Sequence, residues 1–387
     1  MNFSVVLIAR NEAKTLPRLL ASLTEFRQQG GEVVLLDTGS SDDTMKVAAD
    51  AGCRAVSVGE KFLITVSTEE AEAINKKFVF ENEAAVIAAG DRIFDFAAAR
   101  NYAASLASND MIAMPDCDEM YTKLDLEKIT RLIGEGVTQF SYNFVYSHDA
   151  AGKELIKFAH SKFYNRKVMK WTGVIHEVLT FTHGDVEHTH QWLGEDVIKL
   201  EHYQNPATDR SNYLRGLAYD CYKNPNNDRN CHYFARELMY NNRPHSALEA
   251  FSEHISMDRW LTEKAQSMIF VGDCFKMLGQ EEDAVKSYLW SFATDSSRRE
   301  PFMRLAEHYY YKGDHQRAAC YAAAALQIPE TVAYMNWWPY YTYLPHEILY
   351  WALWYLGQKE ESKKHFEIAK QLNPESEKYK QDQQFYN

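Results

Sequence analysis

The sequence predicts an α/β domain with a Rossmann-like, mostly parallel sheet over residues 1–205, followed by an all-α repeat domain over residues 206–387. Two observations lead to this prediction. Strand-like and helix-like segments alternate in the first part of the chain, which is typical of a parallel sheet with crossover helices. From about residue 210 only helical patterns follow, and they recur with a period of 34 residues.

The first predicted strand, residues 3–9, is a continuous apolar run, as expected for a central parallel strand covered on both faces. Helical spacing follows over residues 15–23, and a second strand over residues 32–37. A turn rich in helix-capping residues, 38–44, then leads into a helix over residues 45–51. This order predicts a βαβ unit with a right-handed crossover.

Residues 56–90 are predicted to form an inserted subdomain of unknown role. Strand-like pieces at residues 62–66 and 78–80 flank a helix-like stretch at 68–77. The α/β pattern then resumes with an alanine-rich helix and a strand, at residues 95–107 and 111–115. Further strand-like runs follow at residues 139–146, 156–164 and 178–182.

The helical part contains an internal repeat. Gly279 is followed five residues later by Ala284, and Gly313 by Ala318, so both residues are displaced by 34 positions. Weaker copies lie at Asn242 and Ala247, and at Gly357 and Ser362. Glycine between two helices and a small residue at their crossing, at this period, are the signature of tetratricopeptide repeats. The alternative is a non-repetitive helical bundle with chance spacing.

Two carboxylates follow the predicted strand 111–115 and form a D-x-D motif, Asp116 and Asp118. In open α/β sheets, ligands bind beyond the carboxyl ends of the strands. Mg²⁺ and Mn²⁺ are held by a few carboxylates together with substrate phosphates. The motif therefore predicts a metal site, with a solvated acidic turn as the alternative.

A second polar segment, beginning at Asp37, ends the second strand. Asp37 can accept hydrogen bonds from a base or a ribose, and Gly39 allows a close approach to the backbone. The alternative is a helix N-cap cluster over residues 40–44. Residues 10–12 leave the first strand at the same edge of the predicted sheet.

Taken together, these segments resemble family 2 of the glycosyltransferases, whose fold is of the GT-A type. The resemblance rests on four motifs in order, VLIARNE (6–12), LDTGSSDDT (36–44), DFAAARN (95–101) and PDCDE (115–119). Residues 171–177, WTGVIHE, look like the W-x-G-x-x-H-E element of the subgroup with C-terminal tetratricopeptide repeats. Residues 198–214 look like the junction in that subgroup.

The resemblance implies a role for each matching residue. It gives the nucleobase contact to Asp37, places Ala9 and Glu12 in the same nucleotide pocket, and brings Arg100 near the base or the phosphates. Asp116 would contact the ribose and also share the metal with Asp118. The implied cofactor is Mn²⁺ or Mg²⁺ on the diphosphate of the nucleotide.

The WTGVIHE segment supplies the implied catalytic pair, His176 and Glu177. Glu177 could act as the general base that deprotonates the acceptor hydroxyl. His176 could bind the metal, the diphosphate or the leaving group, and His202 competes with it for the metal role. The alternative for the pair is a buried structural contact. If Glu177 is not the base, Glu119 and Glu195 are the next candidates.

Composition restricts the partners and the compartment. The formal net charge of −12 disfavours non-specific attraction to nucleic acid or to an anionic membrane. The six cysteines form no CxxC pair, so neither a disulfide framework nor a structural zinc site is expected. No apolar run is long enough to cross a bilayer, and the N-terminus lacks signal-peptide features. We therefore expect a cytoplasmic protein.

The expected function is hexosyltransferase-like: transfer of a sugar from a nucleoside diphosphate, with UDP as the expected carrier, to an acceptor hydroxyl. The resemblance implies metal dependence and inversion at the anomeric carbon. A glycan, a protein or another hydroxyl-bearing molecule would be the acceptor, and the repeats could also mediate self-association. The alternatives are a nucleotidyltransferase, which would need a glycine-rich loop near Arg10, and a repeat scaffold with an inactive transferase domain.

Overall fold

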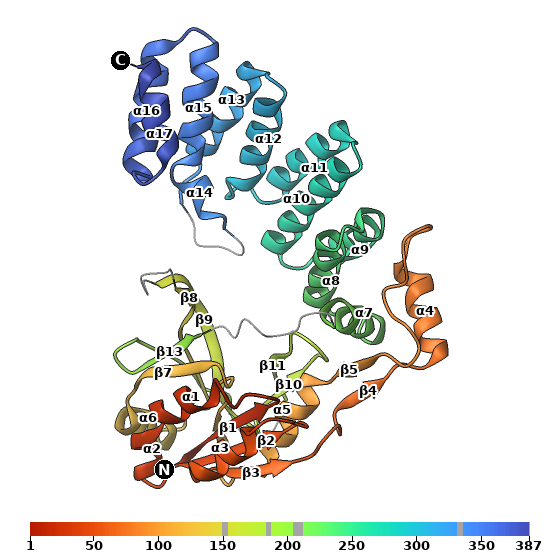
Figure 1. Cartoon of the computed structure of the whole chain (residues 1–387), viewed down its shortest axis with the longest axis vertical. Helices are drawn as coiled ribbons and strands as arrows, with labels where there is room; N and C mark the ends of the chain where they lie inside the picture. The colour runs from red at the N-terminus through yellow and green to blue at the C-terminus, as the bar shows by residue number, and fades with distance from the viewer. Residues whose placement is uncertain (149–153, 183–186, 204–211, 331–335, 387) are drawn as a thin grey trace. The chain divides into compact units, whose positions relative to one another are not determined.

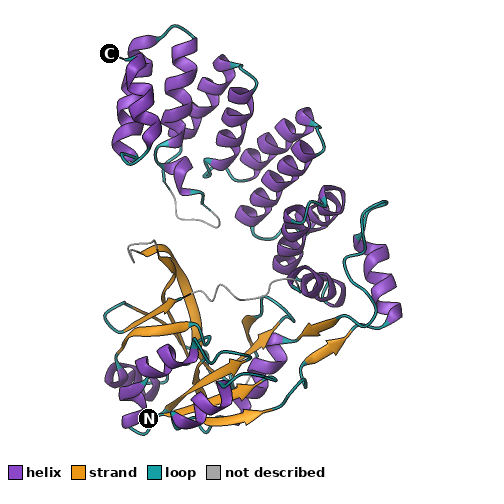
Figure 2. Ribbon diagram, in the orientation of Figure 1, coloured by secondary structure: helices purple, strands orange, loops and turns teal. Residues whose placement is uncertain are grey.

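The structure is a computed structural model that describes the chain except for residues 149–153, 183–186, 204–211, 331–335 and 387 (Figure 1). The chain divides into two compact units. The first unit contains Met1–Glu72 and Ile87–Asp220, and the second contains Ala73–Val86 and Cys221–Asn387. The predicted domain boundary near residue 205 lies outside the described residues. Figure 2 shows strands in the first part of the chain and helices alone after residue 212.

The predicted βαβ unit forms one half of the main sheet, in the strand order β3-β2-β1-β6. These parallel strands are β1 (Phe3–Ala9), β2 (Glu32–Asp37), β3 (Arg54–Ser57) and β6 (Met111–Ala113). The helices between them are α1 (Leu16–Ser22), α2 (Thr24–Gln28), α3 (Thr44–Asp50) and α5 (Phe96–Leu106). Because the strands are parallel, their carboxyl ends meet at one edge of the sheet.

The same sheet continues beyond β6 in the order β9-β8-β13-β7, where every pair is antiparallel except β8 with β13, which is parallel. These strands are β7 (Glu119–Leu124), β8 (Gln139–His148), β9 (Glu154–Asn165) and β13 (Ile198–His202). The sheet is therefore mixed and carries less parallel pairing than predicted, since β9 runs antiparallel to both β6 and β8. Strand β12 (His190–Leu193) pairs with β8, and helix α6 (Leu126–Gly134) connects β7 to β8.

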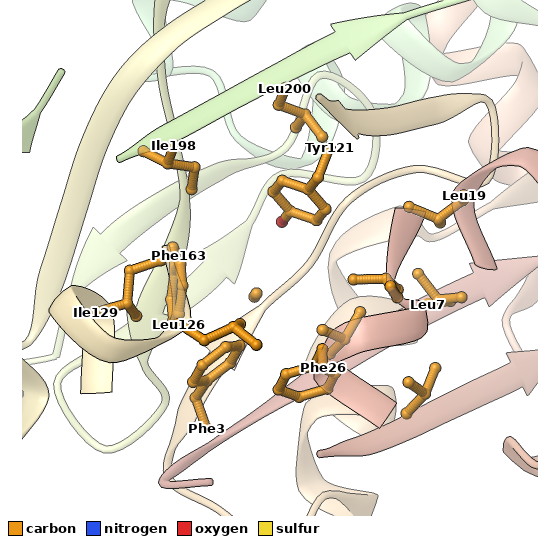
Figure 3. Close-up of a cluster of buried hydrophobic side chains, with 14 of the residues drawn as sticks. Phe3, Leu7, Leu19, Phe26, Tyr121, Leu126, Ile129, Phe163, Ile198 and Leu200 are labelled. Carbon is orange, nitrogen blue, oxygen red and sulfur yellow. The ribbon is translucent and has the colours of Figure 1, made fainter. Parts of the chain in front are cut away.

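Apolar side chains cover both faces of β1, which explains its unbroken apolar sequence. Phe3, Leu7 and their alternate neighbours join one buried cluster with residues from α1, α2 and α6 (Figure 3). Val6 belongs to a second cluster on the other face, together with alanines of α5. The cores on the two faces hold the carboxyl ends of the parallel strands in place.

The segment 56–90 does not stay within one unit. Strand β4 (Leu63–Thr65) pairs with β5 (Arg92–Phe94), and helix α4 (Thr68–Phe78) lies between them. The predicted strand over 78–80 is wrong, because Phe78 ends α4 and packs against Phe234, with the ring centroids 4.9 Å apart. Residues 73–86 group with the helical unit, where the backbone N–H of Phe80 donates to Ser246.

The second unit is a helical repeat, as predicted. The helices after the sheet are α7 (Tyr213–Lys223), α8 (Asp228–Tyr240), α9 (Pro244–Ser256), α10 (Leu261–Met277), α11 (Glu281–Thr294), α12 (Glu300–Tyr311), α13 (His315–Leu326), α14 (Trp338–Tyr341), α15 (Leu344–Tyr355), α16 (Lys359–Leu372), α17 (Glu377–Asp382) and the 3₁₀ turn η1 (Gln383–Phe385). Between paired helices the chain turns through a residue with positive φ, namely Asn242, Gly279, Gly313 and Gly357. Five residues after each turn lies a buried small residue, namely Ala247, Ala284, Ala318 and Ser362. Each turn thus has a residue that tolerates the left-handed conformation, and each crossing lets two helices approach closely.

Candidate functional site

Ends of three neighbouring strands form the base of the candidate site. Ala9 and Asp37 are paired in register at the ends of β1 and β2. The acidic turn after β6 is tied to the same edge because the Cys117 thiol lies 3.4 Å from the carbonyl oxygen of Ile8. The predicted convergence of Ala9, Asp37 and the acidic turn is therefore present at this edge.

Asp116 is enclosed by two cations. Its Oδ1 atom accepts a hydrogen bond of 2.7 Å from Arg100, and its Oδ2 atom accepts one from the Lys162 ammonium group. Burial by itself raises the pKa of Asp116, but the charges of Arg100 and Lys162 outweigh burial and hold the pKa well below its usual range. Asp116 is therefore a carboxylate at neutral pH, with both oxygens already engaged by protein cations.

Arg100 connects the acidic turn to the WTGVIHE segment. It lies on α5, which begins at the N-cap Asp95, whose side chain accepts from the N–H of Ala98. The guanidinium group is buried, and its Nε atom lies 2.5 Å from Oε1 of Glu177. Trp171 packs against the guanidinium group, 5.0 Å from the ring centroid. Arg100 therefore bridges the two carboxylates, because its Nη2 atom donates to Asp116 and its Nε atom donates to Glu177.

Sequence reasoning missed Lys162, which lies on β9 and is buried. Besides Asp116 it contacts Glu119, at 3.0 Å from Oε1. The backbone N–H of Asp116 donates to the other oxygen of Glu119, at 2.8 Å. Burial raises the pKa of the Glu119 carboxyl, and the Lys162 charge opposes that shift. The alternation of side chains along a strand could have indicated that Lys162 points inward. No local pattern could have indicated its partners, Asp116 and Glu119.

His160, two residues before Lys162 on β9, is a further residue that sequence reasoning missed. Burial and the nearby charge of Lys162 lower its pKa well below the usual value for histidine. Its imidazole is therefore neutral at neutral pH and lies 4.7 Å from the ring of Phe144, between centroids.

Asp118 and His202 form a close pair beside this network. The Nε2 atom of His202 lies 3.1 Å from Oδ2 of Asp118, and its Nδ1 atom lies 3.1 Å from the carbonyl oxygen of Tyr146. A carbonyl oxygen can only accept, so Nδ1 carries the hydrogen. A neutral His202 then presents the lone pair of Nε2 to a carboxylate, an arrangement that needs either a proton or a cation. Strand β13 places His202 there because its residues 198–202 pair with β7, which begins directly after Asp118.

Polar groups of the following loop and of β3 hold the Asp37 carboxylate at the end of β2. Asp37 accepts from the backbone N–H of Ser40 at 3.0 Å and from the Ser57 hydroxyl at 2.7 Å. Burial raises the pKa of Asp37, but hydrogen bonds from Ser40 and Ser57 outweigh it and lower the pKa. Glu12 behaves oppositely: burial and then the charges of Asp118 and Asp116 raise its pKa against a hydrogen bond from Thr15. The Glu12 carboxyl therefore interacts electrostatically with the carboxylates of the acidic turn.

The backbone of the WTGVIHE segment is turned twice into the left-handed region, at Gly173 with φ 93° and at His176 with φ 52°. For a histidine this conformation is uncommon and costs energy. The His176 ring packs edge-on against Tyr213, 4.9 Å between centroids. Of the two predicted catalytic residues, Glu177 reaches the Arg100–Asp116 network directly.

Several known proteins share segments with this chain. Residues 4–58 match the model of a family described as glycosyl transferase family 2. A TPR repeat-containing protein of Synechococcus elongatus is 33% identical over 129 residues, which are 33% of this chain and 23% of that relative. The match thus spans about a quarter of the relative's length.

Among solved structures, MamA is 18% identical, with a TM-score of 0.34 over 43% of this chain and 84% of that protein. The Pseudomonas aeruginosa protein PilF is 14% identical, with a TM-score of 0.35 over 44% of this chain and 71% of that protein. Within the described part of the chain, no helix is both long enough and apolar enough to pass through a bilayer.

Proposed function

We propose that the first unit is a metal-dependent glycosyltransferase that takes its sugar from a nucleoside diphosphate, with UDP as the proposed carrier. The observation that carries the proposal is the Asp118–His202 pair at the carboxyl edge of the parallel strands, where α/β sheets bind ligands. The match of residues 4–58 to family 2 of the glycosyltransferases supports the proposal over that segment.

Asp118 and His202 fit a divalent cation by their chemistry. A carboxylate oxygen and an imidazole nitrogen converge there, and the other imidazole nitrogen is fixed by a backbone carbonyl, as is usual for metal-binding histidines. Within the described ranges, no group of three or more histidine, cysteine, aspartate or glutamate side chains could hold a metal ion. The proposal therefore needs the substrate diphosphate to supply the remaining ligands, as Mg²⁺ and Mn²⁺ sites commonly do.

Asp116 has a different role in the proposal from the one its motif suggests. Because Arg100 and Lys162 engage its two oxygens, we assign the metal to Asp118 and His202, and to Asp116 a contact with the ribose. When bound, a divalent cation would neutralise negative charge on the departing diphosphate. Asp37, Glu12 and the backbone at Ala9 are proposed to line the nucleotide pocket at the same edge.

In the proposed reaction, the bond between the anomeric carbon and the diphosphate oxygen breaks while the acceptor oxygen bonds to that carbon with inversion. The acceptor's proton must pass to a base. Glu177 is a candidate, yet its Oε1 atom already contacts the Arg100 Nε atom at 2.5 Å, so that oxygen is engaged within the protein. The geometry therefore favours Glu177 as a positioning residue for Arg100, and the acceptor proton is then proposed to pass to Glu119 or Glu195, the other candidates for the base. His176 is proposed to act on the leaving-group side.

The helical unit is proposed to be a tetratricopeptide-type repeat that binds a protein partner or a second copy of the chain. Its supporting feature is the regular pairing of left-handed turns and buried small residues described above. A cytoplasmic location is likewise a proposal.

The decisive experiment is incubation of the full chain with a panel of nucleotide sugars and Mn²⁺ or Mg²⁺, with release of nucleoside diphosphate as the readout. We expect metal-dependent release from one or a few UDP-sugars. No release from any of them, with or without candidate acceptors, would count against the proposed function. Release of pyrophosphate from nucleoside triphosphates would instead favour nucleotidyl transfer.

A further inference from the structure

One face of the hairpin formed by β8 and β9 carries large apolar side chains that are exposed. Tyr146, Ile156 and Phe158 are 37%, 49% and 45% exposed. They surround the buried ring of Phe144, whose centroid lies 5.3 Å from that of Phe158. We call Tyr146, Ile156 and Phe158 the aromatic strip. Exposed apolar groups that gather in this way commonly mark a binding surface.

The aromatic strip is continuous with the Asp118–His202 pair. The Tyr146 ring stacks on the His202 ring, with centroids 5.2 Å apart and planes at 16°. Phe158 in turn lies 5.8 Å from Tyr146 between ring centroids. A molecule lying on the strip would therefore reach the place where the proposed donor sugar is released from the diphosphate.

The other face of the same hairpin is charged. Lys157, next to Phe158, pairs with Glu195 at 3.1 Å, and Asn143 donates to the same carboxylate at 3.1 Å. Residues alternate between the faces of a strand, so over the regularly paired residues 143–145 and 157–159 the ion pair lies on the face opposite the rings of Phe144 and Phe158.

We infer that the aromatic strip is the acceptor subsite and that the acceptor is a saccharide. The inference rests on the proposed function, because the second substrate of that reaction must lie beside the metal pair. Flat rings such as Tyr146 and Phe158 suit the C–H face of a pyranose, which is the apolar side of an otherwise polar molecule. The imidazole of His160 borders the Phe158 ring and offers a hydrogen-bonding group to hydroxyls.

Two other occupants fit the strip less well. A lipid chain would gain most from a broad aliphatic surface, whereas the strip offers two rings, one isoleucine and polar imidazole edges. An extended peptide would bind chiefly by pairing its backbone along a strand edge, in the plane of the sheet, whereas the rings of the strip lie on the face of the sheet.

Direct binding of simple glycosides is the test, since it does not depend on turnover. Methyl glycosides of glucose, galactose, mannose and N-acetylglucosamine are titrated against the full chain with UDP and Mn²⁺, and binding is followed by saturation-transfer NMR. We expect at least one glycoside to bind and Phe158→Ala to weaken that binding roughly two- to tenfold. Trp192→Ala, which removes an exposed ring on β12, is the matched control and should leave binding unchanged.

The outcomes separate the subsite from the proposed function. Glycoside binding that is absent in the natural chain, or unaffected by Phe158→Ala, would overturn the saccharide subsite. The saccharide subsite would also be overturned if no glycoside bound while a serine-containing peptide or a detergent monomer did bind, and Phe158→Ala abolished that binding. Hydrolysis of the nucleotide sugar is measured without acceptor in the natural chain and in Trp192→Ala, which lies outside the strip and should hydrolyse it at the natural rate. Absence of that hydrolysis in the natural chain would count against the proposed function alone.

Discussion

Arg100 and Glu177 are joined by a contact of 2.5 Å between Nε and Oε1, although they lie 77 positions apart in the sequence. The same guanidinium group donates to Asp116, so the WTGVIHE segment and the acidic turn share one buried cation. A change at Glu177 must therefore affect the acidic turn as well as any proton transfer at Glu177 itself.

Glu177→Gln separates a positioning role from a general base. Glutamine can still accept from Arg100 but loses the charge, so we expect stability to fall by about 1.5–3 kcal/mol, the contribution of a hydrogen bond to a charged group. Transfer should fall less than tenfold and keep its pH profile. A general base would instead lose about 10²–10⁴-fold in transfer with unchanged stability and donor affinity. Thermal melts and transfer rates, with the exposed Glu135→Gln as control, distinguish the two.

Asp116 and Asp118 should respond differently to substitution. Asp116→Asn removes the carboxylate that Arg100 and Lys162 share, although Arg100 keeps Glu177 and Lys162 keeps Glu119, so we expect a loss of roughly 1.5–3 kcal/mol in stability. Asp118→Asn and His202→Gln should leave the melting temperature nearly unchanged and raise the Mn²⁺ concentration for half-maximal hydrolysis roughly tenfold or more. If Asp116→Asn were as stable as the natural chain, the contacts of Asp116 with Arg100 and Lys162 would contribute nothing to stability.

Asp37→Ala should weaken binding of the nucleoside diphosphate. Loss of a hydrogen bond to a carboxylate costs roughly 1.5–3 kcal/mol in binding, which calorimetry with UDP would detect. It also removes the acceptor for the Ser40 N–H and the Ser57 hydroxyl, so the melting temperature should fall too. Asp43→Asn, at an exposed carboxylate in the same loop, is the control. Unchanged UDP affinity in Asp37→Ala would remove this residue from the nucleotide pocket.

The histidine pair of α15 and α16 should make stability depend on pH. The Nδ1 atoms of His346 and His365 lie 2.8 Å apart. Burial, then the charges of His365 and Arg299, lower the pKa of His346 to about 4. Burial also lowers the pKa of His365, with Lys364 acting in the same direction and Glu361 against it.

Because the pKa of these histidines is lower in the native state, the unfolded chain binds more protons than the native state as the pH falls. The stability contribution is therefore present above about pH 6.5 and is lost as the pH falls toward 4. Melting temperatures measured between pH 7.5 and 4.5 should fall less steeply for His346→Gln than for the natural chain. Parallel curves for the two proteins would contradict this expectation.

The sequence predicted those parts of the fold that depend on neighbouring residues. The offset of five residues between Gly313 and Ala318 is local, and it recurs in the structure as a left-handed turn and a buried helix crossing. Likewise, the unbroken apolar run of β1 follows directly from the cores on its two faces.

Long-range pairing could not be predicted in this way. Glu119 reads as one more acidic residue of a polar turn, yet it starts β7 and is buried against Lys162, 43 positions later. The direction of β9 relative to β6 and β8 likewise depends on partners that lie far along the chain, and no local pattern of its sequence indicated it. Sequence reasoning linked Asp118 and His202 only as candidate ligands of the same metal, and no local pattern indicated their direct contact.

The grouping of residues 73–86 with the helical unit limits how the chain can be dissected. A fragment that begins at Cys221 would lack Phe78, which packs on Phe234, and Glu83, whose carboxylate accepts from Ser246. It would also lose the two carbonyl groups, of Ala84 and Ala85, to which Arg243 donates. The repeats therefore have no continuous stretch of sequence that contains all of their own core. Expression of the helical unit by itself would require residues 73–86 to be supplied in trans or joined through a permuted chain.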